Sequence, residues 1–127
     1  MPPEAPAQIA VLLVEDHDLL ADNLVRLLES AGDIRVVAVA TTVADGVAAA
    51  REHRPDVVVM DHRLPDGTGI DATLRIKADR PELPVILLTG ALDATVERAA
   101  LDAGCVIALE KASGATMELA ATVRSLV

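Results

Sequence analysis

The 127-residue sequence contains no phenylalanine, tyrosine or tryptophan, and it has a single cysteine, Cys105. A core without aromatic rings must be filled by aliphatic side chains, and hydrophobic residues make up 52% of the chain. One cysteine excludes an internal disulfide, and its apolar neighbours favour a small buried hydrophobic residue over a reactive thiol. No apolar run approaches the roughly 20 residues that span a bilayer. We therefore expect a cytoplasmic protein with no membrane contact.

Positive charge is also scarce, since 11 lysines and arginines stand against 20 acidic residues and the formal net charge is -9. Binding to a nucleic-acid backbone requires clustered lysine and arginine side chains. We therefore expect no direct nucleic-acid binding, and any contact with DNA would need a separate domain. The length suits one domain. Residues 1–8 are rich in proline and alanine and predict a disordered tail, which leaves residues 9–127 for the domain.

Five apolar runs of strand length alternate with five segments that have helical periodicity. The predicted strands cover residues 9–14, 34–40, 57–61, 85–90 and 106–109, and the predicted helices cover about 18–31, 42–54, 68–78, 93–103 and 113–126. Strands that alternate with single helices form a parallel sheet through right-handed crossovers, with helices on both faces. The pattern therefore predicts an α/β fold, a doubly wound five-stranded parallel sheet in a three-layer sandwich.

Two details of this prediction concern helices. The third helix follows a turn that contains Pro65 and Gly67, and its periodicity predicts that Ile70 and Leu74 face the core. Ser113 is expected to cap the last helix.

Polar side chains occur at the ends of four of the five predicted strands: Glu15 and Asp16 after the first, Asp61 on the third, Thr89 on the fourth and Lys111 after the fifth. Parallel strands end at one edge of the sheet, and the working site of an open α/β sheet lies beyond these carboxyl ends. We therefore expect the five side chains to share one crevice. Taken alone, Asp61 is better explained as a helix cap or a turn residue, so the interpretation depends on the whole set.

Three carboxylates, a hydroxyl and an ammonium in one crevice indicate phosphate chemistry with a metal ion. Close carboxylates repel, and a hard cation with oxygen ligands relieves the repulsion; a small, partly hydrated octahedral site favours Mg²⁺. An ammonium beside a hydroxyl binds the oxygens of a phosphoryl group. A carboxylate can itself be the nucleophile and form an acyl phosphate. We therefore interpret Asp61 as a phosphate acceptor.

The sequence resembles the receiver domain of two-component response regulators, with the flavodoxin-like (CheY-like) fold of that family. The resemblance covers roughly residues 8–126 and is carried by Leu13-Val14-Glu15-Asp16-His17, by Met60-Asp61-His62-Arg63-Leu64-Pro65-Asp66-Gly67-Thr68-Gly69, by Leu88-Thr89-Gly90 and by Glu110-Lys111-Ala112-Ser113. The last segment lacks the usual lysine-proline pair, as in receivers that precede a LuxR-type (NarL/FixJ-type) helix-turn-helix domain. This similarity suggests a receiver taken from a longer transcription regulator.

The resemblance implies that a sensor histidine kinase or a phosphotransfer protein donates a phosphoryl group to Asp61. It also implies that Asp16 and Asp61 bind Mg²⁺ together with the backbone carbonyl of Arg63, while Glu15 assists through water. A phosphatase of the haloacid dehalogenase kind would need a second aspartate two residues after the nucleophile, where this chain has Arg63.

The resemblance further implies that Thr89 bonds to one phosphoryl oxygen and that Lys111 pairs with another. Such a domain assists its own phosphorylation and dephosphorylation but is not a conventional enzyme, and the resemblance leaves a homodimer open. Ala108 is a departure, because many receivers carry tyrosine or phenylalanine three residues before the lysine. That ring swings inward when the threonine moves. Its absence keeps an alternative open, a pseudo-receiver that is not phosphorylated and serves as a dimerisation or docking module.

Overall fold

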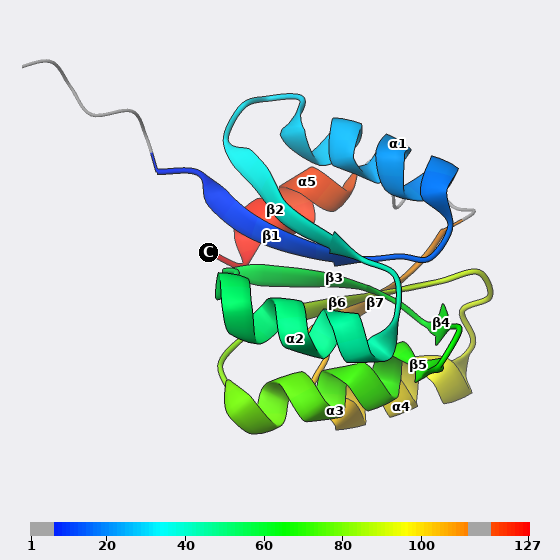
Figure 1. The fold of residues 1–127 in the computed structure, drawn as a ribbon. Helices are drawn as coiled ribbons and strands as arrows, with labels where there is room; N and C mark the ends of the chain where they lie inside the picture. Colours follow the sequence, from blue (N-terminus) through cyan, green and yellow to red (C-terminus); the bar gives the residue numbers. More distant parts are fainter. Residues whose placement is uncertain (1–6, 112–117) are drawn as a thin grey trace, which may run out of the picture.

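The computed structural model describes residues 7–111 and 118–127. Its central feature is a parallel sheet of five strands in the order β2-β1-β3-β6-β7 (Figure 1). The strands are β1 (Ile9–Val14), β2 (Ile34–Ala40), β3 (Val57–Asp61), β6 (Val85–Thr89) and β7 (Ile107–Glu110). Each neighbouring pair is parallel, so all carboxyl ends lie at one edge.

Helices cover both faces of this sheet (Figure 1). One face carries α1 (Asp18–Glu29) and α5 (Leu119–Ser125), and the other carries α2 (Val43–His53), α3 (Gly69–Asp79) and α4 (Ala94–Ala103). The predicted doubly wound three-layer sandwich is therefore confirmed. None of the helices in the described part of the chain is long and apolar enough to cross a membrane.

The central strands are buried on both faces, which explains why they appear in the sequence as continuous apolar runs. Successive side chains of a strand point to opposite faces. Val11, Leu13, Val57 and Val59 pack in the cluster formed with α1 and α5, whereas Leu12, Val14, Val58 and Met60 pack in the cluster formed with α2, α3 and α4. The first cluster is aliphatic, and the second is aliphatic apart from Met60 and Cys105.

Side chains with short polar groups determine where the helices begin, because each accepts a hydrogen bond from an otherwise unpaired amide of the first turn. Thr42 accepts from Asp45 at the start of α2, Thr68 accepts from Asp71 at the start of α3, and Asp93 accepts from Val96 at the start of α4. The alternation of strand and helix thus has a local chemical cause at each of these boundaries.

Several details differ from the sequence-based prediction. The last strand covers residues 107–110, one residue later than expected. The predicted turn after β3 contains a small antiparallel hairpin of β4 (Arg63–Leu64) and β5 (Gly67–Thr68). Positions 1–6 of the predicted tail and the predicted cap at Ser113 lie outside the described residues, and the described part of α5 begins at Leu119.

The prediction that Leu74 faces the core is wrong, because its side chain is 53% exposed. Ala72, Thr73 and Ile76 are the buried residues of α3 instead. Ile70, the other residue of the predicted apolar face, is partly buried and packs against the core.

Gly69 has no room for a side chain. A Cβ at this position would overlap the carbonyl oxygen of Asp61 and would lie 2.8 Å from Cγ of Met60. The Gly69 amide donates to the carbonyl of His62 at 2.7 Å, and the Thr73 hydroxyl donates to the carbonyl of Gly69 at 2.7 Å. These contacts place the start of α3 directly against the backbone of Asp61.

Replacing Gly69→Ala should therefore lower the free energy of unfolding by about 2 to 3 kcal/mol, because the added methyl group meets backbone that has no free space to move. Urea denaturation measures the change. Gly90→Ala is the matched control, since a Cβ there has no neighbour within 4 Å and should alter the unfolding free energy by less than about 0.5 kcal/mol. Equal midpoints for the two variants would contradict the assignment of Gly69 as a close-packing residue.

Candidate functional site

A crevice of about 810 Å³ opens at the carboxyl edge of the sheet. The structure brings together in it all five side chains that the sequence places at strand ends, Glu15, Asp16, Asp61, Thr89 and Lys111. The strand order explains this convergence, because β3 lies between β1 and β6, and β7 lies next to β6. Residues that are distant in the sequence therefore line one cavity.

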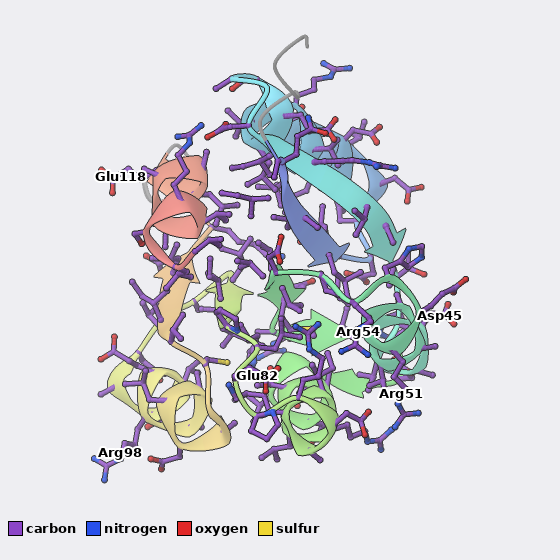
Figure 2. The ribbon with its side chains drawn as sticks, turned by 90° about the vertical axis from the view of Figure 1, so that its left-hand side faces the viewer. Asp45, Arg51, Arg54, Glu82, Arg98 and Glu118 are labelled. Atoms are coloured by element: carbon purple, nitrogen blue, oxygen red, sulfur yellow. The ribbon has the colours of Figure 1, made fainter. Side chains whose placement is uncertain are left out.

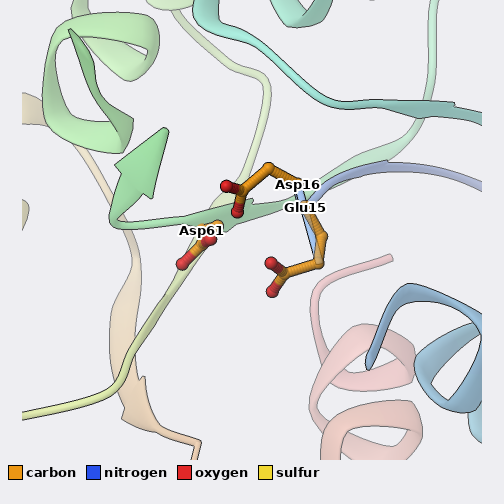
Figure 3. A group of neighbouring side chains, drawn as sticks. All are labelled: Glu15, Asp16 and Asp61. Carbon is orange, nitrogen blue, oxygen red and sulfur yellow. The ribbon is translucent and has the colours of Figure 1, made fainter. Parts of the chain in front are cut away.

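The carboxylates of Glu15, Asp16 and Asp61 gather around one space (Figure 3), and each offers an oxygen within 4.8 Å of the others. Glu15 and Asp61 are buried, with only 1% and 5% of their surfaces exposed, whereas Asp16 is exposed to solvent. The backbone holds this arrangement, since the Glu15 amide donates to the carbonyl of Ala40 at 2.9 Å and the His62 amide donates to the carbonyl of Leu88 at 2.8 Å. The three carboxylates could hold a metal ion.

The ammonium of Lys111 lies between the two buried carboxylates. Its Nζ is 2.8 Å from Oε1 of Glu15 and 2.8 Å from Oδ1 of Asp61. The amide of Lys111 donates to the carbonyl of Thr89 at 2.8 Å, so the pairing of β6 with β7 positions this side chain. One ammonium faces three carboxylates, and the crevice keeps an excess of negative charge.

Burial and the neighbouring charges both affect the ionisation of Glu15. Burial raises the pKa of Glu15 above its ordinary value of 4.5, the neighbouring Asp61 raises the pKa further, and Lys111 only partly opposes them. Burial alone would lower the pKa of Lys111, but Asp61 and Glu15 outweigh burial and raise it above 10.5. The ammonium is therefore charged at neutral pH.

Glu15 Oε1 is buried, and the Lys111 ammonium that it contacts at 2.8 Å is shared with Asp61. Three carboxylates with one ammonium between two of them are a fitting ligand set for a hard cation that prefers oxygen. The donor set contains no sulfur and no histidine, which disfavours softer transition metals.

Thr89 is buried at the end of β6, and its hydroxyl closes a turn in the loop that follows. The hydroxyl donates to the carbonyl of Ala91 at 3.2 Å and accepts from the amide of Ala91 at 3.4 Å. In this structure the hydroxyl is thus engaged with its own loop.

Other side chains of the motif segments lie at the edge of the crevice. Arg63 is exposed, begins β4 and lines the opening. His17 caps α1 by accepting from the amide of Leu20 at 3.4 Å. His62 lines the crevice, and its Nδ1 is buried without a partner among the described residues. Neither histidine belongs to the carboxylate cluster.

Sequence reasoning missed two acidic residues that support the loops around the site. Asp66 accepts from the amides of Val43 at 2.6 Å and Ala44 at 3.1 Å, which ties the loop after β3 to the start of α2 and lowers the pKa of Asp66. Glu110 accepts from the amide of Leu92 at 3.2 Å. Their partners are 18 to 23 residues away, so no local pattern could reveal them.

A smaller groove of about 250 Å³ lies between the C-terminal ends of α2 and α3, on the side shown in Figure 2. It is lined by Arg51, Arg54 and Arg80, but Arg51 pairs with Asp79 at 2.6 Å and Arg80 pairs with Glu82 at 3.4 Å. Cations are favoured at helix C-termini and anions are not. The arginines are therefore explained by the helix ends, and the candidate site is the acidic crevice.

The fold and the crevice together define a class of protein, a doubly wound α/β domain whose strand ends present carboxylates, a hydroxyl and an ammonium. The family model of the response regulator receiver domain matches residues 11–124. The chain belongs to the family of response regulator receiver domains of two-component systems.

Similar proteins include response regulators. The response regulator protein VraR of Staphylococcus aureus is 35% identical over 96 residues, which are 76% of this chain and 46% of VraR. A LuxR-family two-component response regulator from Aurantimonas sp. SI85-9A1 has a TM-score of 0.89 at 28% identity, covering 94% of this chain and 85% of that chain. The signal receiver domain of the response regulator NarL from Mycobacterium tuberculosis has a TM-score of 0.87 at 26% identity, covering 95% and 98%.

The predicted resemblance to receivers of LuxR-type and NarL-type regulators is thus confirmed. The chain spans about half the length of the curated relatives it matches.

The raised pKa of Glu15 predicts a pH dependence. The folded state binds more protons than the unfolded chain between pH 4.5 and the raised pKa, so the protein should lose stability as the pH rises through that window. Lys111 does not change the stability with pH in this window, because its stabilising contribution is complete below pH 10.5. Glu15→Gln should remove this loss of stability, which amounts to about 1.4 kcal/mol of unfolding free energy for each unit by which the pKa of Glu15 is raised.

Urea denaturation between pH 5 and pH 8 measures this effect. The advantage of Glu15→Gln over the unsubstituted protein should grow with pH and then level off. The control Glu97→Gln removes an exposed carboxylate from α4 and should follow the unsubstituted protein. If the unfolding free energies of Glu15→Gln and the unsubstituted protein change in parallel with pH, the raised pKa of Glu15 would be refuted.

Proposed function

We propose that this receiver domain accepts a phosphoryl group from a histidine kinase, or from a phosphotransfer protein, on Asp61. The observation that carries the proposal is the ammonium of Lys111, which lies 2.8 Å from a buried carboxylate at the end of the central strand. A carboxylate can act as the nucleophile that attacks phosphorus. Asp61 also faces a crevice large enough to admit an imidazole-bound phosphoryl group.

Mg²⁺ is the proposed cofactor, and it would be held by Asp16 and Asp61 with the backbone carbonyl of Arg63, while Glu15 assists through water. The support is the cluster of three carboxylates, two of which share the ammonium of Lys111. When bound, the ion supplies positive charge that offsets the negative charge of the carboxylates and of the transferred group.

The remaining steps use groups of the chain itself. An oxygen of Asp61 forms a bond to phosphorus as the bond from phosphorus to the donor histidine breaks, and the released imidazole retains the electron pair. Lys111 is positioned to pair with a phosphoryl oxygen, because its ammonium already contacts Asp61. The Thr89 hydroxyl leaves the carbonyl of Ala91 and donates to another phosphoryl oxygen. Water later hydrolyses the acyl phosphate.

The domain assists these reactions without a dedicated product, so we do not regard it as a conventional enzyme. Its proposed output is the control of transcription, in keeping with its similarity to LuxR-family regulators. The net charge of -9 argues against direct DNA contact by this domain. A second copy of the chain, in a homodimer, is a further proposed partner.

Incubation with acetyl phosphate and Mg²⁺ tests the proposal. Intact-mass measurement should show one added phosphoryl group, which is lost on treatment with hydroxylamine because the bond is an acyl phosphate. Asp61→Asn should carry no adduct, because an amide is a poor nucleophile. The control Asp22→Asn, at an exposed position on α1, should be labelled like the unsubstituted protein.

An adduct that persists in Asp61→Asn would place the acceptor elsewhere. The absence of any adduct in the unsubstituted protein would favour the alternative of a pseudo-receiver that acts only as a dimerisation or docking module.

Binding of Mg²⁺ should also stabilise the fold, which thermal unfolding measures. At a concentration one hundred times its Kd, the ion should raise the free energy of unfolding by about 2.7 kcal/mol. In Asp16→Asn a tenfold loss of affinity would reduce this gain to about 1.4 kcal/mol at the same concentration. Asp22→Asn again serves as the control and should keep the full gain. Equal stabilisation of the Asp16 and Asp22 variants would refute the assigned metal site.

A further inference from the structure

The peptide unit between Ala91 and Leu92 is held at both of its ends. Its carbonyl, from Ala91, accepts the hydroxyl of Thr89 at 3.2 Å. Its amide, from Leu92, donates to Oε1 of Glu110 at 3.2 Å. Because a peptide unit is planar and rigid, rotation of this unit displaces both groups together. Its orientation is therefore controlled jointly by Thr89 and Glu110.

Thr89 and Glu110 both lie at the ends of paired strands of the sheet. Thr89 is the last residue of β6 and Glu110 the last residue of β7, and the two are direct partners in the strand register. The Lys111 amide fixes this pairing by donating to the carbonyl of Thr89 at 2.8 Å. The strand ends are anchored, so motion is confined to the loop that begins at Gly90.

This loop leads directly into α4. Asp93 caps the helix by accepting from the amide of Val96 at 2.8 Å, and the helix begins at Ala94. Gly90 is exposed, and a Cβ there would have no neighbour within 4 Å, so packing does not hold the loop at that point. A rotation of the Ala91–Leu92 peptide therefore moves the cap of α4.

An aromatic relay is excluded, because the chain contains no aromatic residue. Ala108, at the corresponding position of β7, is 5% exposed and packs in the core. A methyl group has no alternative rotamer that could report the position of Thr89. The signal from the acceptor must reach α4 by other groups.

We propose that Glu110 is a positioning residue that holds the Ala91–Leu92 peptide in its resting orientation and thereby replaces the aromatic relay. The inference rests on the proposed function, since a phosphoryl group on Asp61 would draw the Thr89 hydroxyl away from Ala91. Glu110 then holds the peptide alone. When the peptide turns, its amide leaves Glu110 and the start of α4 shifts, so the Glu110 hydrogen bond opposes activation in the resting state.

Glu110→Ala tests the inference, with beryllofluoride and Mg²⁺ as the probe, because beryllofluoride on a carboxylate imitates a phosphoryl group. Removal of the hydrogen bond should favour the active orientation and tighten the apparent affinity for beryllofluoride by about threefold to tenfold. In the protein without beryllofluoride, amide hydrogen exchange at Leu92 should accelerate at least about tenfold.

Two further variants separate the hydrogen bond from the charge and from the fold. Glu110→Gln keeps an oxygen acceptor of the same reach and should behave like the unsubstituted protein in both measurements. Glu110→Asp keeps the charge but is shorter by one methylene group and should behave like Glu110→Ala, which gives a result even if the alanine variant does not fold. The control Glu97→Ala removes an exposed carboxylate from the first turn of α4 and should change neither measurement.

The outcomes distinguish the inference from the function on which it rests. If the unsubstituted protein does not bind beryllofluoride with Mg²⁺, the proposed function fails and the inference fails with it. If the unsubstituted protein binds but neither Glu110→Ala nor Glu110→Asp binds more tightly, only the role of Glu110 is refuted. Unchanged exchange at Leu92 in these two variants would refute it as well.

Discussion

The structure of the crevice depends on one ion pair network, in which the ammonium of Lys111 lies between the buried carboxylates of Glu15 and Asp61. A buried carboxylate without a cationic partner is costly. A single ammonium makes two of them tolerable but does not neutralise the third acid, Asp16. Burial and, after it, the neighbouring Asp61 raise the pKa of Glu15, and the cluster of three carboxylates suits a further cation.

The order of the strands brings the residues of this network together. The pairing of β7 with β6 places the ammonium of Lys111 in the crevice, and the position of β3 between β1 and β6 places Asp61 there. Behind Asp61 the chain turns sharply, and only a glycine at position 69 allows α3 to start against the backbone of the acceptor. The chemistry of the crevice and the packing of α3 therefore constrain the same few residues at the end of β3.

The loop between β6 and α4 is built differently from the anchored strand ends. The Thr89 hydroxyl donates to and accepts from Ala91, and Glu110 accepts from the amide of Leu92. Gly90 and Ala91 are exposed, whereas Leu92 packs partly buried against the core. A segment held mainly by a few hydrogen bonds has a low free energy of local rearrangement. Such a segment can change orientation when the Thr89 hydroxyl is attracted to a phosphoryl group on Asp61. No aromatic side chain is needed for this change, in keeping with the alanine at position 108.

The alternation of strands and helices and the five polar side chains at the strand ends could be predicted from the sequence, because strands that are buried on both faces appear as apolar runs that end on polar residues. The buried face of α3 is known only from the folded structure, in which Ala72 and Ile76 are buried and Leu74 is exposed. The partners of Asp66 and Glu110 and the raised pKa of Glu15 likewise depend on the folded structure. These properties arise from distances between residues far apart in the chain, and no local pattern encodes such distances.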